Sequence, residues 1–136
     1  MSAFLIRPQD VETADCLLEN IQIGGKHITL HFAEIYHTDL QAFAPNVVIE
    51  ISDWQQFRGR AYHAKTGHSR TIAETAIEPL EAVAAYRFQE RHPRAGGGCL
   101  LTLQGFALPP SEEWLEYVFV QPVVRVTQRP SEKRKP

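Results

Sequence analysis

The sequence predicts an α+β protein in which β structure dominates: an antiparallel curled sheet or small β-sandwich with one short helix near residues 79–91. Three observations support this prediction. Several short runs alternate polar and apolar residues, turns rich in glycine or proline separate these runs, and residues 79–91 are rich in helix formers and begin with proline. The 136 residues, 43% of them hydrophobic and 22% charged, have the composition of one globular domain with its own core.

The N-terminal part of the chain favours a short helix followed by a β-hairpin. Residues 10–18 have apolar side chains at helical spacing, and Asp10 can cap the first turn. Residues 20–23 and 27–32 alternate polar and apolar side chains, and the Gly24-Gly25-Lys26 segment between them is typical of a tight turn. We therefore expect two antiparallel strands joined near residue 25.

The middle of the chain predicts further strands and a loop. Residues 46–53 place Val47, Ile49 and Ile51 on one face, which indicates a half-buried strand. Residues 54–62 are expected to continue this strand or to pair with it, with an interruption at Gly59. Residues 65–70 are polar and contain glycine, so we expect an exposed loop there.

The predicted helix follows this loop. Residues 71–74 have the spacing of a capping box, and Pro79 stands at a natural first helical position for a helix that runs to residue 91. His92-Pro93 and the three glycines at 96–98 end the helix. The alternative is that residues 86–90 form the end of a strand.

Two further strands are expected at residues 99–108 and 114–127, joined by a turn with two prolines. Both faces of the second run are apolar, so this strand is expected to be central in its sheet or covered by a partner. Gln121-Pro122 interrupts the backbone ladder and indicates a bulge or a change of neighbouring strand.

Charge separates a body from a tail. The net charge is −2, but residues 1–127 hold ten basic and fifteen acidic side chains, whereas residues 128–136 hold four basic side chains and one acid. We expect residues 1–127 to form a single domain and residues 128–136 to be a disordered basic tail. The acidic body argues against a dedicated DNA-binding domain. The sequence has no apolar run that could span a membrane and no secretory leader, which predicts a cytoplasmic protein.

The spacing of the histidines and glycines indicates no metal, cofactor or catalytic site. His27 and His31 would lie about 13 Å apart along one strand, at ~3.3 Å per residue, which is too far for one ion. The glycines at 96–98 precede a strand, whereas glycine loops that bind phosphate precede a helix. We therefore expect no cofactor.

Two segments are candidate binding surfaces. Residues 57–70 contain no acid, and they hold arginine, lysine and aromatic side chains that pair with phosphates and stack on bases: Phe57, Arg58, Arg60, Tyr62, Lys65 and Arg70. The second segment is acidic around an aromatic ring and suits a basic partner: Glu112, Glu113, Trp114 and Glu116. The alternative for both is an exposed strand or turn, where charge discourages edge-to-edge pairing.

The order of the strand segments resembles that of a known group of proteins. The segments are Leu-Leu-Glu-Asn-Ile-Gln-Ile, His-Ile-Thr-Leu-His-Phe, Val-Val-Ile-Glu-Ile-Ser-Asp-Trp, Leu-Thr-Leu-Gln-Gly-Phe and Glu-Trp-Leu-Glu-Tyr-Val-Phe. They resemble small bacterial mostly-β proteins that are uncharacterised or are immunity proteins of polymorphic toxin systems. The resemblance covers residues 17–55 and 99–127. It implies a single-domain cytoplasmic protein that binds another protein, without cofactor or catalytic residues.

Three functional hypotheses follow. The first is a non-enzymatic protein-binding module, either an immunity-type inhibitor or a self-associating domain that forms a homodimer. The second is an anion or nucleic-acid binder that uses residues 57–70. The third is a small enzyme with a pocket near His63, His68 and Asp53.

Overall fold

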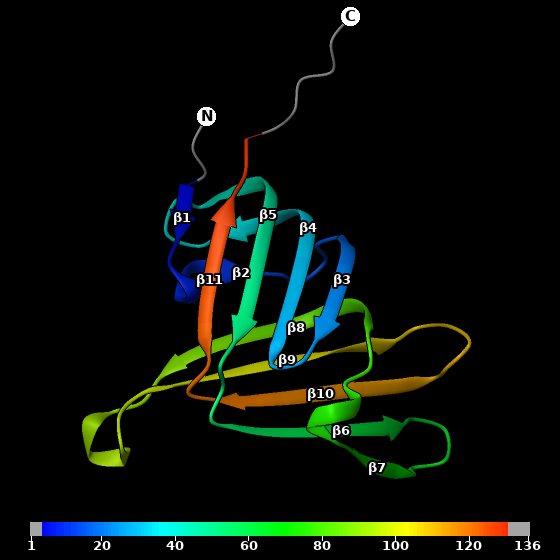
Figure 1. Ribbon diagram of the computed structural model, residues 1–136. Coiled ribbons are helices and arrows are strands. Elements are labelled where there is room, and N and C mark those ends of the chain that lie inside the picture. Colours follow the sequence, from blue (N-terminus) through cyan, green and yellow to red (C-terminus); the bar gives the residue numbers. More distant parts are fainter. Residues whose placement is uncertain (1–3, 131–136) are drawn as a thin grey trace, which may run out of the picture.

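The chain folds into two antiparallel β-sheets whose inner faces share one hydrophobic core. The computed structural model describes residues 4–130. In Figure 1 the strands of the upper sheet run across those of the lower sheet, an arrangement in which the chain turns a corner each time it changes sheet. The β-dominant fold class predicted from the sequence is confirmed.

Sheet A, the upper sheet in Figure 1, has the strand order β1-β11-β5-β4-β2, and β3 also pairs with β4. Its strands are β1 (Phe4–Ile6), β2 (Val11–Glu12), β3 (Leu18–Gly24), β4 (His27–His37), β5 (Ala42–Ser52) and β11 (Val123–Gln128). The predicted hairpin is confirmed as β3 and β4, with Ile23 paired to Ile28 on either side of the turn. Gly25 has a φ of 57°, the left-handed conformation that such turns need.

Sheet B has the strand order β7-β6-β10-β9-β8. Its strands are β6 (Gln56–His63), β7 (Ser69–Ile72), β8 (Leu80–Glu90), β9 (Cys99–Ala107) and β10 (Glu113–Val120). The chain crosses from sheet A to sheet B after β5 and returns at Gln121-Pro122. The sequence prediction of a change of neighbour at this dipeptide is confirmed, and so is the central position of β10, which lies between β6 and β9.

The core lies between the two sheets. In β5, the side chains of Val47, Ile49 and Ile51 are fully buried, as the alternation predicts. The facing side chains of sheet B are also buried: Leu101 and Leu103 from β9, and Leu115, Tyr117 and Phe119 from β10. Both sheets therefore follow the alternation of a sandwich, with one face inward and one outward.

The predicted helix at residues 79–91 is wrong, because this segment forms the strand β8. The register against β9 shifts twice, between Leu80 and Ala82 and between Val83 and Ala85. Each bulge adds one residue, so the buried side chains of β8 fall at Leu80, Val83 and Tyr86. This spacing of three imitates the periodicity of a helix. The alternative prediction, that residues 86–90 end a strand, is correct.

The other local helix signals are also wrong. Residues 10–18 contain the end of a short 3₁₀ helix (Pro8–Asp10) and the strand β2, and they are not an α-helix. The Asp10 carboxylate accepts hydrogen bonds from Arg7 instead of capping a helix. Residues 71–74 end β7 and begin a 3₁₀ helix (Glu74–Ala76) that has no side-chain cap.

Three predictions for the segments near the candidate surfaces differ from the structure: the interruption at Gly59, the pairing of residues 54–62 and the loop at residues 69 and 70. Gly59 does not interrupt β6, which pairs with β7 and β10 and not with β5. A Cβ at Gly59 would lie 2.9 Å from the Ile72 carbonyl oxygen, so glycine allows β7 to approach. Residues 69 and 70, expected in a loop, belong to β7.

The first residues of the predicted disordered tail have defined structure. Gln128 ends β11, and the Arg129 amide donates a hydrogen bond to the Asn46 carbonyl oxygen. The remainder of the predicted tail, residues 131–136, lies outside the described residues. Within residues 4–130, no helix is long and apolar enough to cross a membrane.

Candidate functional site

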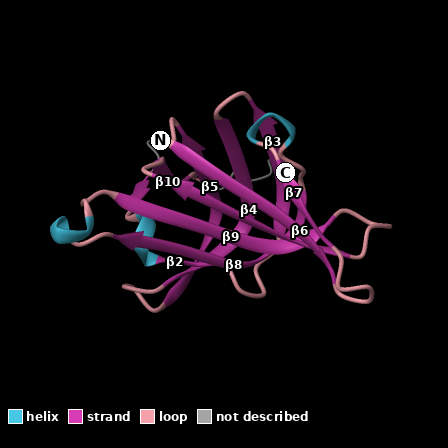
Figure 2. Ribbon diagram, turned by 90° about the horizontal axis from the view of Figure 1, so that it is seen from below, coloured by secondary structure: helices cyan, strands magenta, loops and turns pink. Residues whose placement is uncertain are grey.

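The outward face of sheet B presents a row of three aromatic side chains. Tyr62 of β6, Trp114 of β10 and Phe106 of β9 are direct cross-strand neighbours. Tyr62 is 45% exposed and Phe106 is 54% exposed, and the Phe106 and Trp114 rings meet edge to face with centroids 5.0 Å apart. Figure 2 views the molecule from the side of sheet B, where β6, β10, β9 and β8 run side by side. We call this surface the open face.

A polar row lies next to the aromatic row on the open face. Arg60, Glu116 and Gln104 are cross-strand neighbours two residues further along the same strands. The Arg60 guanidinium donates to Glu116 Oε1 at 3.3 Å, and the Gln104 amide donates to Glu116 Oε2 at 2.6 Å. Both oxygens of this carboxylate are therefore engaged, which fixes the three side chains relative to one another.

The polar row lines a groove of about 430 Å³, together with Tyr62 and Trp114 of the aromatic row and Ser69 of β7. A second hollow of about 500 Å³ continues along the face past Arg58, Thr71 and Val118. Strand alternation explains this lining, because residues 58, 60 and 62 of β6 share the outer face while Gly59 and Ala61 are buried. The groove is thus a property of the sheet surface and does not penetrate the core.

The basic and acidic candidate segments are one surface. Antiparallel pairing of β6 with β10 places residues 58–63 directly beside residues 113–118. Arg60 pairs with Glu116, and Lys65 approaches Glu112 at 3.0 Å. His63 also lies 3.7 Å from Glu112. The positive charge that the sequence presented as a site for anions is therefore largely matched by carboxylates.

Arg70 is the most constrained of these basic side chains. Its guanidinium donates two hydrogen bonds to Glu78, at 2.7 and 2.9 Å, and two to Glu113, at 2.7 and 3.0 Å. The hydrogen bonds to Glu113 and Glu78 raise the pKa of Arg70. The hydrogen bond from Arg70 lowers the pKa of Glu113 below its ordinary value of 4.5. This cluster ties β7, β10 and the segment before β8 together, which is a structural role.

The remaining predicted residues divide between the two faces. Phe57 packs against the core, with its ring centroid 5.4 Å from that of Phe119 and 5.7 Å from that of Tyr117. It is only partly buried, and it does not line the groove. Arg58 lies on the outer side, beside Val118. Gln104 lines the groove and Phe106 lies beside Trp114 in the aromatic row, and neither is among the site residues predicted from the sequence. Their alternation with Leu101 and Leu103 gave a signal for an outward position, but not for their neighbours.

The outward face of sheet A has a different character. Gln22, Thr29, Glu50 and Arg125 form a cross-strand row of polar side chains there. This row has the composition of a solvent-facing surface. Further along β4 and β5, Tyr36 and Phe43 form an edge-to-face pair in which Phe43 is 62% exposed. The open face of sheet B differs because its aromatic side chains form a row across three strands.

The histidines have local partners. His27 lies 3.5 Å from Glu50, and His31 Nε2 lies 2.8 Å from the Asn46 side-chain oxygen. Within the described part of the chain, no three histidine, cysteine or acidic side chains are placed to hold a metal ion.

The residues of the enzyme hypothesis do not come together. His63 and His68 meet in the β6–β7 turn, where the His63 amide donates to the His68 carbonyl oxygen at 2.8 Å. Asp53 lies before the start of β6, so the full length of that strand separates it from His63.

Comparisons with known proteins add no relative: no family model, no curated protein sequence and no solved structure matches this chain.

Proposed function

We propose that this protein is a non-enzymatic protein-binding module and that the open face of sheet B holds its partner. The observation that supports this proposal is the row of Tyr62, Trp114 and Phe106 beside Arg60 on an outward sheet face. Tyrosine, tryptophan and arginine are the residues most enriched among the energetic centres of protein interfaces. A sheet face that contacts only water does not require three adjacent aromatic side chains.

The polar groups of the open face also suit a protein partner. The Glu116 carboxylate is already hydrogen-bonded by Arg60 and Gln104, so covering it leaves no isolated charge buried. Charge pairs at the margin, such as Lys65 with Glu112, remain in solvent and can guide orientation. The net charge of −5 on residues 1–127 favours a basic partner. The sequence resemblance implies a toxin as the partner of an immunity-type inhibitor, and the acidic body favours a basic toxin.

The matched charges make nucleic acid a weaker occupant. Phosphate binding needs lysine and arginine side chains that are free to replace counterions. In the candidate segment, Arg60, Lys65 and Arg70 each pair with a carboxylate. Within residues 4–130, Arg58 differs from these three side chains because it has no carboxylate partner.

Affinity capture with a substitution series tests the proposal. The tagged protein is incubated with lysate of its source organism, treated with nuclease, at about 0.1 and 0.3 M salt, where exposed charge contacts are screened to different extents. The captured partner is then produced separately, and its affinity is measured for the wild type and for Trp114→Ala. We expect about a thirtyfold loss, which corresponds to about 2 kcal/mol at an interface centre.

A matched control uses the other sheet. Thr29→Ala on the outward face of sheet A should leave the affinity unchanged. Equal affinity of Trp114→Ala and wild type would show that the partner does not bind the open face. Recovery of nucleic acid alone, lost after Arg58→Glu with Arg60→Glu, would replace this proposal with the anion-binding hypothesis. Concentration-dependent association of the protein with itself, abolished by Trp114→Ala, would identify the partner as a second copy.

A further inference from the structure

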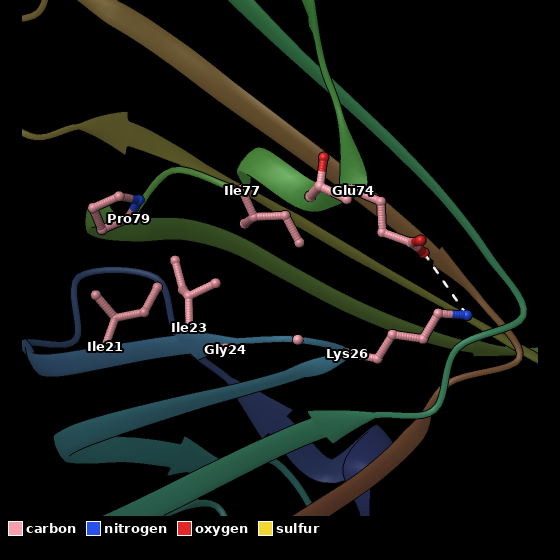
Figure 3. Close-up of a pocket in the computed structure, with 9 residues that line it drawn as sticks. Ile21, Ile23, Gly24, Lys26, Glu74, Ile77 and Pro79 are labelled. Carbon is pink, nitrogen blue, oxygen red and sulfur yellow. Dashed lines mark ion pairs between the residues drawn. The ribbon is translucent and has the colours of Figure 1, made fainter.

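Another hollow opens between the two sheets, away from the groove of the open face. It has a volume of about 670 Å³ and lies between β3 and the segment that leads into β8. Figure 3 shows Ile21 and Ile23 of β3 opposite Ile77 and Pro79 of that segment. We call this hollow the edge cleft. None of its lining residues lines the groove of the open face.

The walls of the edge cleft are core side chains that the sandwich leaves half-covered. Ile21 and Ile23 share the inner side of sheet A with their cross-strand neighbours Leu30 and Ile28. Those neighbours are fully buried, whereas Ile21 and Ile23 are only partly buried although they pack against the same core. The two sheets therefore part at β3, and an apolar surface continuous with the core faces the opening.

One end of the edge cleft holds a cation and an anion side by side. The Trp54 indole donates a hydrogen bond of 2.5 Å to Glu74 Oε1, and Lys26 Nζ donates to the Trp54 carbonyl oxygen at 3.2 Å. Lys26 Nζ and Glu74 Oε1 are 4.0 Å apart, as the dashed line in Figure 3 marks. Their side chains are 52% and 39% exposed, so both charges are accessible from the cleft.

This arrangement selects for a neutral head group. A hydroxyl can accept a hydrogen bond from an ammonium and donate one to a carboxylate at the same time. A carboxylate head would meet the like charge of Glu74, and an ammonium head would meet the like charge of Lys26. Either charged head would also lose hydration without gaining a complete partner set.

We propose that the edge cleft binds an uncharged amphiphile, with its hydrocarbon chain between the isoleucines of the cleft and its hydroxyl group between Lys26 and Glu74. The size of the cleft and its apolar walls with a few polar groups at one end are typical of small-molecule sites. The binding energy comes from covering Ile21, Ile23 and Ile77, and the polar end sets the specificity for the head group.

A series of short alcohols tests the apolar part of the proposal. Binding of 1-butanol, 1-hexanol and 1-octanol is followed by the NMR shifts of isoleucine methyl groups. We expect saturable shifts at Ile21, Ile23 and Ile77, with affinity that rises about threefold to fourfold for each added methylene. Thr75→Phe places a ring in the cleft from an exposed position and should abolish binding, whereas Leu40→Ser, at an exposed residue outside the cleft, should not.

Charged analogues test the polar end. Wild type should bind 1-octanol at least about tenfold more tightly than octanoate or octylammonium, because each ion faces a like charge. Glu74→Gln keeps an acceptor for the Trp54 indole and should improve octanoate binding, whereas Lys26→Met should improve octylammonium binding. Equal affinity for the three head groups in all variants would overturn the assignment of Lys26 and Glu74. Absence of saturable shifts with every alcohol would overturn the site itself.

Discussion

Replacing Arg70 with methionine tests whether the basic segment is structural. Arg70 joins Glu78 and Glu113 through four hydrogen bonds, and its side chain is 40% exposed. Arg70→Met keeps most of the apolar stem and removes the guanidinium. It therefore leaves two carboxylates facing each other without the cation between them.

The magnitude follows from the geometry of the two pairs. An exposed ion pair contributes about 0.2–1 kcal/mol, and a bidentate arginine pair lies near the upper end of this range. Two such pairs, with Glu113 only 17% exposed, give about 1–2 kcal/mol at neutral pH and low salt. The 40% exposure of Arg70 means that solvent screens the pairs, so we expect no larger loss.

The pH dependence has a definite sign. Arg70 lowers the pKa of Glu113, so the stability from this carboxylate is present above its ordinary pKa of 4.5 and is lost as the pH falls through the lower, folded-state value. Arg70→Met removes that shift. The difference in unfolding free energy between wild type and variant should therefore be largest near pH 7 and shrink below pH 4.5.

Urea unfolding measures this difference. It is followed by tryptophan fluorescence near pH 7 and below pH 4.5, each at about 0.05 and 1 M salt. Arg70→Lys is the matched control, because it keeps the charge but not the planar fork, and it should lose about half as much. A loss for Arg70→Met that is the same at both pH values and both salt concentrations would show that packing of the stem, and not charge, explains its effect.

Three further predictions concern the fold. Gly105→Ala should lower the unfolding free energy, measured by urea unfolding, by about 3 kcal/mol, because the added Cβ would collide with the backbone carbonyl of Ala82. A Cβ at Gly24 would have open space, so Gly24→Ala should be close to neutral. Burial raises the pKa of Tyr117 to about 12, so the stability that this shift contributes is fully present below pH 10 and is lost as the pH rises through 12. The unfolding free energy of Tyr117→Phe should therefore decline less than that of the wild type between pH 10 and 12. Burial also raises the pKa of the Cys16 thiol, so alkylation at pH 8 should be at least about tenfold slower in the folded protein than in urea, and equal rates would contradict its burial.

The error at β8 shows how a local pattern can imitate another structure. Its sequence is rich in helix formers, and its buried residues Leu80, Val83 and Tyr86 are spaced by three. Helix propensity differs by only a few tenths of a kcal/mol per residue among ordinary residues, whereas pairing with β9 buries whole side chains. The tertiary contact therefore decides the structure. Two bulges in β8 allow a segment whose buried residues are spaced by three to pair with β9 as a strand.

The candidate site was predicted in parts. Residue type predicts Arg60, Tyr62, Trp114 and Glu116 as binding residues, and the structure brings these four together around one groove. Phe57 meets the same criterion, but it packs against the core and does not line the groove. Residue type suggests which side chains can bind, but the face of the strand decides which of them can be reached.

Features that depend on near neighbours along the chain can be predicted from the sequence alone. Alternation with a period of two predicts the hairpin of β3 and β4 and the buried face of β5, because side-chain direction along a strand is a local property. The missing N–H of Pro122 indicates the interruption between β10 and β11. The pairing of β6 with β10, whose paired residues lie 50 to 64 positions later in the chain, is visible only in the folded protein. Such pairing depends on burial summed over both sheets and on closing a long loop, and neither leaves a local signal. That pairing turned a basic segment and an acidic segment into one charge-matched face, and the parting of the sheets at β3 opened the edge cleft.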